Sequence, residues 1–159
     1  TANISSFNED IREWTVTDVS NMSGMFNGAS SFDQDISGWN VSSVQDMSGM
    51  FIGASDFNKN IGSWTVTDVS NMNGMFNGAT SFNQDISGWN VSNVTDMNNM
   101  FSGATDMSQN IWVWDVCGNA TFDNIFAASA MSFVLNNNNV PGGNNANAGT
   151  GNGSWFTGP

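Results

Sequence analysis

Residues 82–105 read FNQDISGWNVSNVTDMNNMFSGAT, and this stretch decides the fold because it recurs at a fixed distance. Shifted 25 residues toward the N-terminus it reappears as FNKNIGSWTVTDVSNMNGMFNGAT. Two earlier copies read FDQDISGWNVSSVQDMSGMFIGAS and FNEDIREWTVTDVSNMSGMFNGAS. A period of this size is typical of a solenoid, in which each repeat forms one coil of the chain.

Apolar residues recur at the same place in each repeat and form columns. The five main columns are Phe7, Phe32, Phe57, Phe82 and Met107; Ile11, Ile36, Ile61, Ile86 and Ile111; Trp14, Trp39, Trp64, Trp89 and Trp114; Val16, Val41, Val66, Val91 and Val116; and Phe26, Phe51, Phe76, Phe101 and Phe126. Two methionine columns run beside them. A single coil cannot bury these side chains alone, whereas stacked neighbours can.

Two short patterns predict the local structure within each coil. Trp-x-Val alternates apolar residues with period two and predicts a short strand, so that the strands of successive coils form a narrow parallel sheet. Val-x-x-Met-x-x-Met-Phe has helical spacing interrupted by glycine and predicts one or two turns of α- or 3-10 helix. We therefore predict a repeat solenoid of five to six 25-residue coils, with short parallel strands and short helical turns.

The repeat begins at Phe7, in full register and without an evident polar cap, and it decays in the fifth copy. From residue 136 the composition changes to NNNNVPGGNNANAGTGNG, which is typical of a flexible linker, and SWFTGP follows. We therefore predict a solenoid domain over residues 1–135 and an Asn/Gly-rich tail with an aromatic tip over residues 136–159.

The charge balance excludes several classes of function. Fourteen acidic residues against two basic ones give a net charge of −12, which disfavours nucleic acid and anionic membrane surfaces as partners. No apolar run approaches the roughly 20 residues of a membrane span. The chain has no histidine, so Cys–His and Ser–His catalytic pairs cannot form, and we predict that the protein is not an enzyme.

Polar columns raise the question of a cofactor. They are Asp10, Asp35, Asn60, Asp85 and Asn110; Asn21, Asp46, Asn71 and Asp96; and Asp18, Ser43, Asp68 and Asn93. Like charges one coil apart repel, and the alternation of Asp with Asn or Ser favours a solvated ladder over a calcium site, although carboxylate and amide oxygens are calcium ligands. We predict no cofactor, with calcium as the alternative.

The tryptophan column and the asparagines suggest carbohydrate in two different ways. Trp and Val two residues apart share one face of a strand, which favours a buried core over a glycan-binding strip. Glycosylation sequons of the form N-x-[ST] are frequent because the chain is rich in Asn, Ser and Thr. They lie at Asn3, Asn21, Asn40, Asn90, Asn93, Asn119 and Asn152.

The repeat motif F-N-Q-D-I-x-x-W-x-V-S-x-V-x-x-M-x-x-M-F-x-x-A resembles that of the BspA-like leucine-rich-repeat surface proteins. The resemblance covers roughly residues 7–130. It implies a leucine-rich-repeat-like solenoid at the surface of a bacterial or protist cell, with a role in adhesion or extracellular structure and no catalysis.

The ends of the stack suggest how the chain functions. A bare end exposes apolar surface and unpaired strand edges, which can template another copy of the chain. The residues predicted to take part in this self-assembly are Phe7, Ile11, Trp14, Phe133, Val134, Leu135, Trp155 and Phe156. The first hypothesis is an extracellular structural protein that associates head to tail into a fibre or surface layer. The alternative is a monomeric cell-surface adhesin that binds a protein or glycan through a lateral face.

Overall fold

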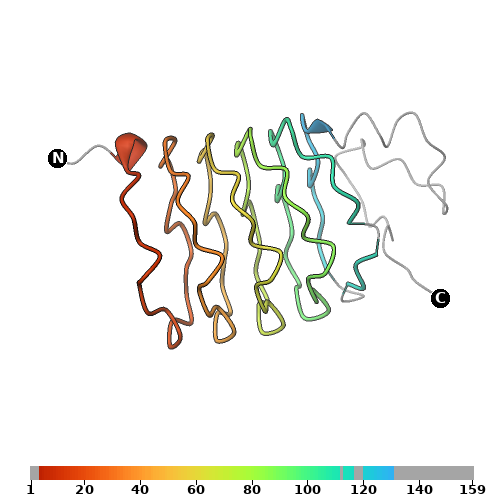
Figure 1. Ribbon diagram of the computed structural model, residues 1–159. Helices are drawn as coiled ribbons and strands as arrows, with labels where there is room; N and C mark the ends of the chain where they lie inside the picture. The colour runs from red at the N-terminus through yellow and green to blue at the C-terminus, as the bar shows by residue number, and fades with distance from the viewer. Residues whose placement is uncertain (1–3, 112, 117–119, 131–159) are drawn as a thin grey trace.

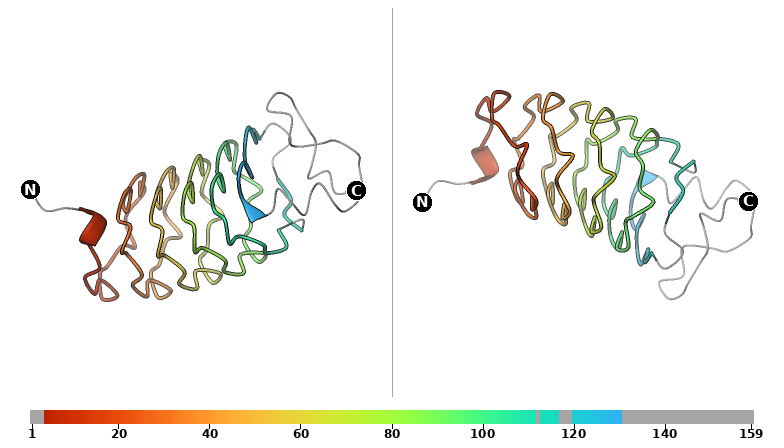
Figure 2. Two further views of the ribbon diagram at one scale, coloured as in Figure 1. Left: turned by 90° about the horizontal axis from the view of Figure 1, so that it is seen from above. Right: turned by 90° about the horizontal axis from the view of Figure 1, so that it is seen from below.

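The computed structural model describes residues 4–111, 113–116 and 120–130, and in them each 25-residue repeat forms one coil. The coils lie side by side in chain order, so the stack has a first and a last coil at opposite ends (Figure 1). Views from above and below show the same order (Figure 2). The coils are named one (residues 7–31), two (32–56), three (57–81), four (82–106) and five (107–130). The assignment of this stack to the leucine-rich-repeat-like class stays a prediction.

One row of the backbone hydrogen bonds between neighbouring coils runs in a single direction. In every pair of neighbours, four N–H groups of the earlier coil donate to four carbonyls of the later coil, at 2.7–3.0 Å. Between coils one and two these bonds run from Met22 to Asp46, from Gly24 to Ser48, from Phe26 to Met50 and from Gly28 to Ile52. Because the donors of this row always belong to the earlier coil, the row has a direction, whereas bonds beside it, such as that from Gln45 to Ser20, run the other way.

The parallel backbone pairing between coils does not lie at the predicted strand. Within the described residues the parallel pairing consists of isolated bridges, and these join Asn21, Asp46, Asn71, Asp96 and Thr121. The Trp-x-Val segment forms no strand in any described coil. Its backbone is folded into turns instead, since the N–H of each Trp donates to the Ile carbonyl three residues earlier, as Trp39 does to Ile36.

The segment with helical spacing also differs from its prediction. Residues 19–29 form no helix, and the one 3-10 helix within the described residues, η1 (Ile4–Ser6), precedes coil one. The N–H groups alternate: that of Met25 donates to Met22 three residues earlier, whereas that of Phe26 donates to the next coil. In a helix every backbone N–H would bond to a carbonyl of the same segment. The alternation instead lets the segment form hydrogen bonds within its own coil and donate others to the next coil.

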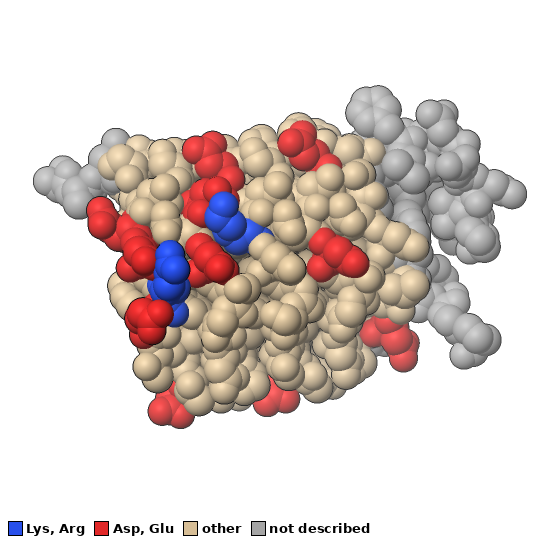
Figure 3. Space-filling view, in the orientation of Figure 1, with Lys and Arg blue, Asp and Glu red and all other residues tan. Residues whose placement is uncertain are grey.

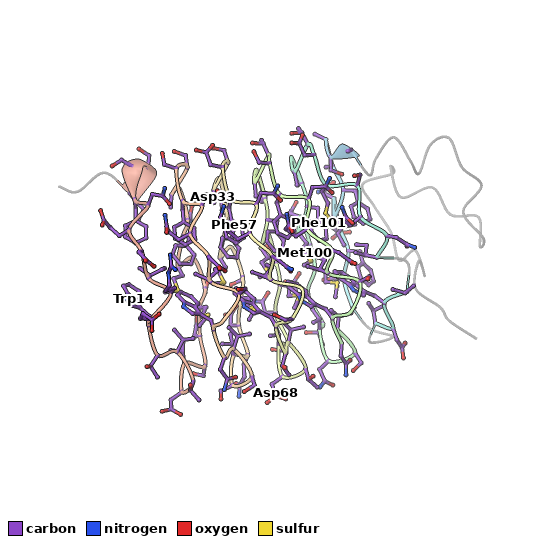
Figure 4. The ribbon with its side chains drawn as sticks, viewed as in Figure 1. Trp14, Asp33, Phe57, Asp68, Met100 and Phe101 are labelled. Atoms are coloured by element: carbon purple, nitrogen blue, oxygen red, sulfur yellow. The ribbon has the colours of Figure 1, made fainter. Side chains whose placement is uncertain are left out.

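Stacked phenylalanines fill the interior. Phe51 lies 4.1 Å from Phe57 of the next coil, measured between ring centroids, and 5.5 Å from Phe76, and the rings are nearly parallel. Phe57, Met100 and Phe101 lie inside the stack (Figure 4), and all three are fully buried. Offset parallel rings at these separations add to the gain from burying apolar area.

Two positions of the repeat, each followed from coil to coil as a column, have backbone with positive φ. Gly24, Gly49 and Gly74 take φ of 61–66° in the first column, and Asn99 and Asn124 continue it at 59° and 56°. The second column starts at Gly28 and is glycine through coil four, after which Ala128 takes φ of 54°. Residues other than Gly and Asn are strained in this region, so coil five carries a cost that the earlier coils avoid.

We predict opposite effects of exchanging Gly and Ala in this second column. Gly78→Ala should lower the free energy of unfolding by about 1–2 kcal/mol, because Gly78 has φ of 72°, which strains any residue with a Cβ, whereas the nearest atoms, 3.6 Å away in Gly53, would be in ordinary contact. Ala128→Gly should raise it by up to about 1 kcal/mol. Urea unfolding measures both.

Gly88 provides the matched control. It lies outside the positive-φ columns and a Cβ there would meet nothing within 4 Å. Gly88→Ala should therefore leave stability unchanged or slightly raised. Equal effects of Gly78→Ala and Gly88→Ala would contradict this account of the second column.

Candidate functional site

A hydrogen bond from tryptophan to the preceding coil repeats through the stack. In coils two to five the indole Nε1–H donates to an isoleucine carbonyl of the coil before it, at 3.1–3.2 Å. The pairs are Trp39 with Ile11, Trp64 with Ile36, Trp89 with Ile61, and Trp114 with Ile86. These four indoles are only 3–5% exposed, so each coil covers the tryptophan of the next.

Trp14 occupies the same position in coil one but has no coil before it among the described residues. Its side chain is 52% exposed, and no described residue accepts a hydrogen bond from its indole N–H. One side of the ring stacks on Trp39, with centroids 6.4 Å apart. Trp14 therefore lies at the end of the stack with its opposite side uncovered (Figure 4).

A row of backbone acceptors lies at the same end. The carbonyls of Asn21, Ser23, Met25 and Asn27 are the coil-one counterparts of the four carbonyls that accept bonds in coil two. No described residue donates to any of the four. The neighbouring Ser20 N–H is a donor without a described acceptor, whereas its counterpart Gln45 donates to the Ser20 carbonyl at 2.8 Å.

Apolar side chains accompany this row. Met25 is partly exposed, whereas its counterparts Met50, Met75 and Met100 are fully buried. Phe7 is likewise only partly buried against the core. We call Trp14, Met25 and the backbone of residues 20–27 the coil-one face. It combines a strip of apolar surface with unpaired polar backbone groups, which is the character of an unpaired sheet edge.

Helix η1 covers one corner of this end. The Ser31 N–H and the Ser30 hydroxyl both donate to the Ser5 carbonyl at 3.0 Å, as Ser55 does to Ser30 one coil later. Helix η1 therefore takes the place of a preceding coil at this corner, so the prediction of an uncapped first coil does not hold there.

Charged residues lie around coil one. Arg12 donates from its backbone N–H and its Nε to Asp10 at 3.2 and 3.0 Å, and these bonds hold the pKa of Asp10 below its ordinary value. Glu9 stands where later coils carry Gln or Lys. On the face shown in Figure 3, both basic side chains lie beside carboxylates over the first coils and much of the remainder is uncharged.

An amide ladder runs along one lateral face. A glutamine donates to the backbone and side-chain oxygens of an asparagine in the preceding coil, as Gln84 does to Asn58 at 2.9 and 2.8 Å. Coils two and three replace this pair by Asp33 and Lys59, joined at 2.6 Å. Both members of the pair have changed together, so an ion pair occupies the place of an amide hydrogen bond.

We predict that Asp33→Asn with Lys59→Gln restores the amide ladder without loss of stability. The ion pair is about one-third exposed on both sides, so its coupling free energy in a double-mutant cycle should be only about 0.2–1 kcal/mol. The measurement is urea unfolding of the two single variants and the double variant. A double variant that unfolds more than about 1 kcal/mol more easily would show that the ion pair has a larger role.

The first acidic column consists of turns that accept backbone hydrogen bonds. The Ser37 N–H donates to Asp35 at 3.0 Å and the Ser87 N–H donates to Asp85 at 2.9 Å. Hydroxyl and backbone donors of Ser37 and Ser87 hold the pKa of both carboxylates below its ordinary value. Asn60 fills the same role uncharged, accepting from Gly62 at 2.9 Å. The column is therefore a series of local turns.

The carboxylates that the structure describes in these columns do not gather into a cluster. Across residues 4–111, 113–116 and 120–130, no three side chains of Asp, Glu, Cys or His come together in a way that could hold a metal ion. The calcium alternative thus gains no support from the described side chains.

We predict that stability falls in acid through this column. Because the folded state lowers the pKa of Asp10, Asp35 and Asp85 below 3.8, their stabilising effect is complete above that pH and is lost as the pH falls through the folded values. Asp35→Asn with Asp85→Asn should reduce the loss, since Asn keeps the acceptor but does not titrate. Urea unfolding between about pH 5 and pH 2 tests this, and an unchanged pH dependence would contradict it.

The predicted assembly residues divide between the coil-one end and the tail. Ile11 is buried at 2% exposure and Phe7 is partly buried, so of the three in coil one only Trp14 presents its side chain openly. Phe133, Val134, Leu135, Trp155 and Phe156 lie outside the described residues, as does the whole tail of residues 136–159.

The predicted sequons divide in the same way. Asn21, Asn40, Asn90 and Asn93 are exposed. Asn3, Asn119 and Asn152 lie outside the described residues. Asn21 and Asn40 accept hydrogen bonds from the backbone N–H two residues later, which places both in local turns.

Sequence reasoning missed Met25 and the carbonyl row. Met25 reads as one more member of a buried column, and only its place in the first coil distinguishes it. The carbonyls carry no sequence signal, because the direction in which a backbone N–H points depends on the fold. Trp14, in contrast, can be found from its column and its position in the first repeat.

Hydropathy and similarity to known proteins both bear on what the chain is. The described residues contain no helix that is both long and apolar enough to cross a membrane. The family described as "Mycoplasma protein of unknown function, DUF285" matches residues 2–73 and again residues 36–140. No curated protein and no solved structure matches the chain. The two overlapping matches together span most of the sequence.

Proposed function

The chain belongs to the DUF285 family, a family of repeat-containing proteins, and from that premise we propose that it is an extracellular structural protein whose copies associate end to end. The observation that carries the proposal is the exposure of Trp14, 52% against 3–5% for its four described counterparts. An exposed indole offers a large apolar ring together with a hydrogen-bond donor, which suits an interface.

The contact between coils supplies the template for such an interface. Four times within the described chain, a coil covers the tryptophan of the next, accepts its indole N–H and donates four backbone N–H groups to it. The coil-one face presents the same tryptophan and the same carbonyls without that partner. A second copy can therefore bind by repeating a contact that the fold already uses.

The direction of the backbone bonds favours head-to-tail association. Two coil-one faces each present the carbonyls of Asn21, Ser23, Met25 and Asn27, and acceptors cannot bond acceptors. A symmetric dimer through this face would leave the row unsatisfied. A head-to-tail contact does not close on itself, so it continues into a fibre or layer.

The cell-surface location rests on the resemblance of the repeat to the BspA-like leucine-rich-repeat surface proteins. The exposed asparagines of the described sequons and the uncharged amide ladder support a lateral surface that faces solvent along the fibre. Such a surface leaves the two ends as the places where copies meet.

Trp14→Ala tests the proposal. We expect the variant to fold, because Trp14 is half exposed at the end of the stack, and to weaken self-association about tenfold or more, because the side chain is an apolar anchor of the interface. Light scattering on a dilution series measures the association constant, and negative-stain imaging shows whether fibres form.

Val113→Ala is the matched control, since Val113 is an apolar side chain of coil five that is 65% exposed. It should associate like the wild type. Raising the salt concentration should strengthen association of the wild type, because each copy carries a charge of −12. A wild-type chain that stays monomeric at every concentration and salt would overturn the proposal and direct the search to a ligand of a lateral face.

A further inference from the structure

Asparagine is followed directly by glycine at three places in the described part of the chain, all in coils one and three. A glycine nitrogen can approach the side-chain amide of the preceding asparagine closely, because glycine has no Cβ to hinder it. Such pairs are therefore the asparagines most prone to lose ammonia spontaneously. They are Asn27-Gly28, Asn73-Gly74 and Asn77-Gly78, and a fourth pair, Asn152-Gly153, lies outside the described residues.

The reaction needs a glycine nitrogen that is free to move and to lose its proton. The backbone N–H gives its proton to water or hydroxide, a bond forms between this nitrogen and the asparagine Cγ, and the side-chain nitrogen leaves as ammonia. Water then opens the resulting succinimide ring at either carbonyl. The products are aspartate and isoaspartate, and in isoaspartate the main chain runs through Cγ.

The stack holds the required N–H in all three pairs. The N–H of Gly28 donates to the Ile52 carbonyl at 2.7 Å, and that of Gly78 donates to the Ser102 carbonyl at 2.8 Å. The N–H of Gly74 donates in the same way to Asn98 at 2.8 Å. A donor held by the next coil cannot lose its proton or turn toward the asparagine until that bond opens, which is also the condition for hydrogen exchange.

Burial does not provide this protection. Asn27 is exposed, and Asn73 and Asn77 are half-buried, so water reaches all three side chains. Asn73 has a restraint of its own, because its Nδ2 donates to both carboxylate oxygens of Asp96 at 3.3 and 3.2 Å. The hydrogen bond from the glycine to the next coil is the restraint that all three pairs share.

We propose that Asn27, Asn73 and Asn77 are latent deamidation sites, which the hydrogen bonds between coils keep intact and which react when the coils separate. The inference concerns a single copy of the chain, so it does not depend on the association proposed above.

The products prevent the coils from closing again. Isoaspartate lengthens the main chain by one carbon, whereas the donors of the row lie on every second residue. At residue 77 the extra carbon displaces the Gly78 N–H from the Ser102 carbonyl. At residue 73 either product places a second carboxylate beside Asp96, which it repels. Separation of the coils is therefore followed by a permanent chemical change.

Peptide mapping by mass spectrometry tests the proposal on the full-length chain. The chain is incubated in mildly alkaline buffer and in concentrated urea, and short peptides that contain each pair give the intrinsic rate in the same buffer. Each described pair should react at least about tenfold more slowly in the folded chain than in its peptide, and at the rate of the peptide in urea. Equal rates in the folded chain and the peptides would overturn the proposal.

Phe101→Leu distinguishes reaction through opening from slow reaction in the closed stack. Phe101 is fully buried and stacks on Phe76 of coil three, with ring centroids 5.6 Å apart. The variant should therefore raise the rate at Asn77 about threefold or more. Val113→Ala, at a side chain that is 65% exposed, is the control and should leave the rate unchanged.

Circular dichroism checks that Phe101→Leu folds, and Phe101→Met replaces it if it does not. A rate at Asn77 that does not respond to the folded variant shows that the reaction does not pass through opening, which overturns the proposal.

A serine variant tests whether the change is permanent. Serine stands at the place of Asn77 in coil four, as Ser102, and at the place of Asn73 in coil two, as Ser48. Asn27→Ser with Asn73→Ser and Asn77→Ser should therefore fold like the wild type and lack all three sites, while both chains keep Asn152.

Both chains are aged in urea and returned to buffer. The wild type should lose its ability to refold as isoaspartate accumulates, whereas the triple serine variant should refold fully. Full recovery of wild-type chains that carry isoaspartate at residue 77 would overturn the claim that the coils cannot close again.

Discussion

The hydrogen bond from each tryptophan indole to the isoleucine carbonyl one coil earlier is the contact on which the stack depends. It buries a large ring and satisfies its one polar group in a single step, at 3.1–3.2 Å in all four described instances. The bond also has a direction, because the tryptophan always reaches toward the N-terminal neighbour. A coil therefore completes the one after it and is completed by the one before, and coil one has no such neighbour among the described residues.

This dependence explains why the two sides of a coil are not equivalent. In the backbone row the earlier coil donates and the later coil accepts, so the coil-one carbonyls of Asn21, Ser23, Met25 and Asn27 have no described donor. A row of mixed donors and acceptors could pair with itself, whereas four carbonyls beside the single Ser20 N–H require a surface that offers donors. The fold thus specifies the orientation of any partner before side chains are considered.

The sequence predicted the coils and their columns but not how the coils are joined. The period, the buried Phe, Ile and Trp columns and the exposed position of Trp14 follow from repeat spacing alone. The strand predicted at Trp-x-Val is absent because the backbone there closes turns on the preceding isoleucine, as Trp39 does on Ile36. The parallel bridges join the Asn21 and Asp46 column instead, where alternation of local and inter-coil bonds has no signature in residue type.

The predicted helical turns are absent for a related reason. Spacing of three and four suits a helix, but Gly24 and Gly28 take positive φ and redirect every second N–H to the next coil. Glycines that interrupt an apolar pattern at constant spacing were the available signal. In coil five, where Asn124 and Ala128 replace them, the same path persists at a higher conformational cost.

The most direct test of this account is the solvent exchange of the Trp14 indole proton, followed by NMR in dilute and concentrated protein and assigned with a Trp14→Phe variant. The account predicts rapid exchange in the monomer and strong protection once copies associate, because the interface covers the ring and gives its N–H an acceptor. Association that leaves the exchange of this proton unchanged would contradict the claim that copies meet at the coil-one face.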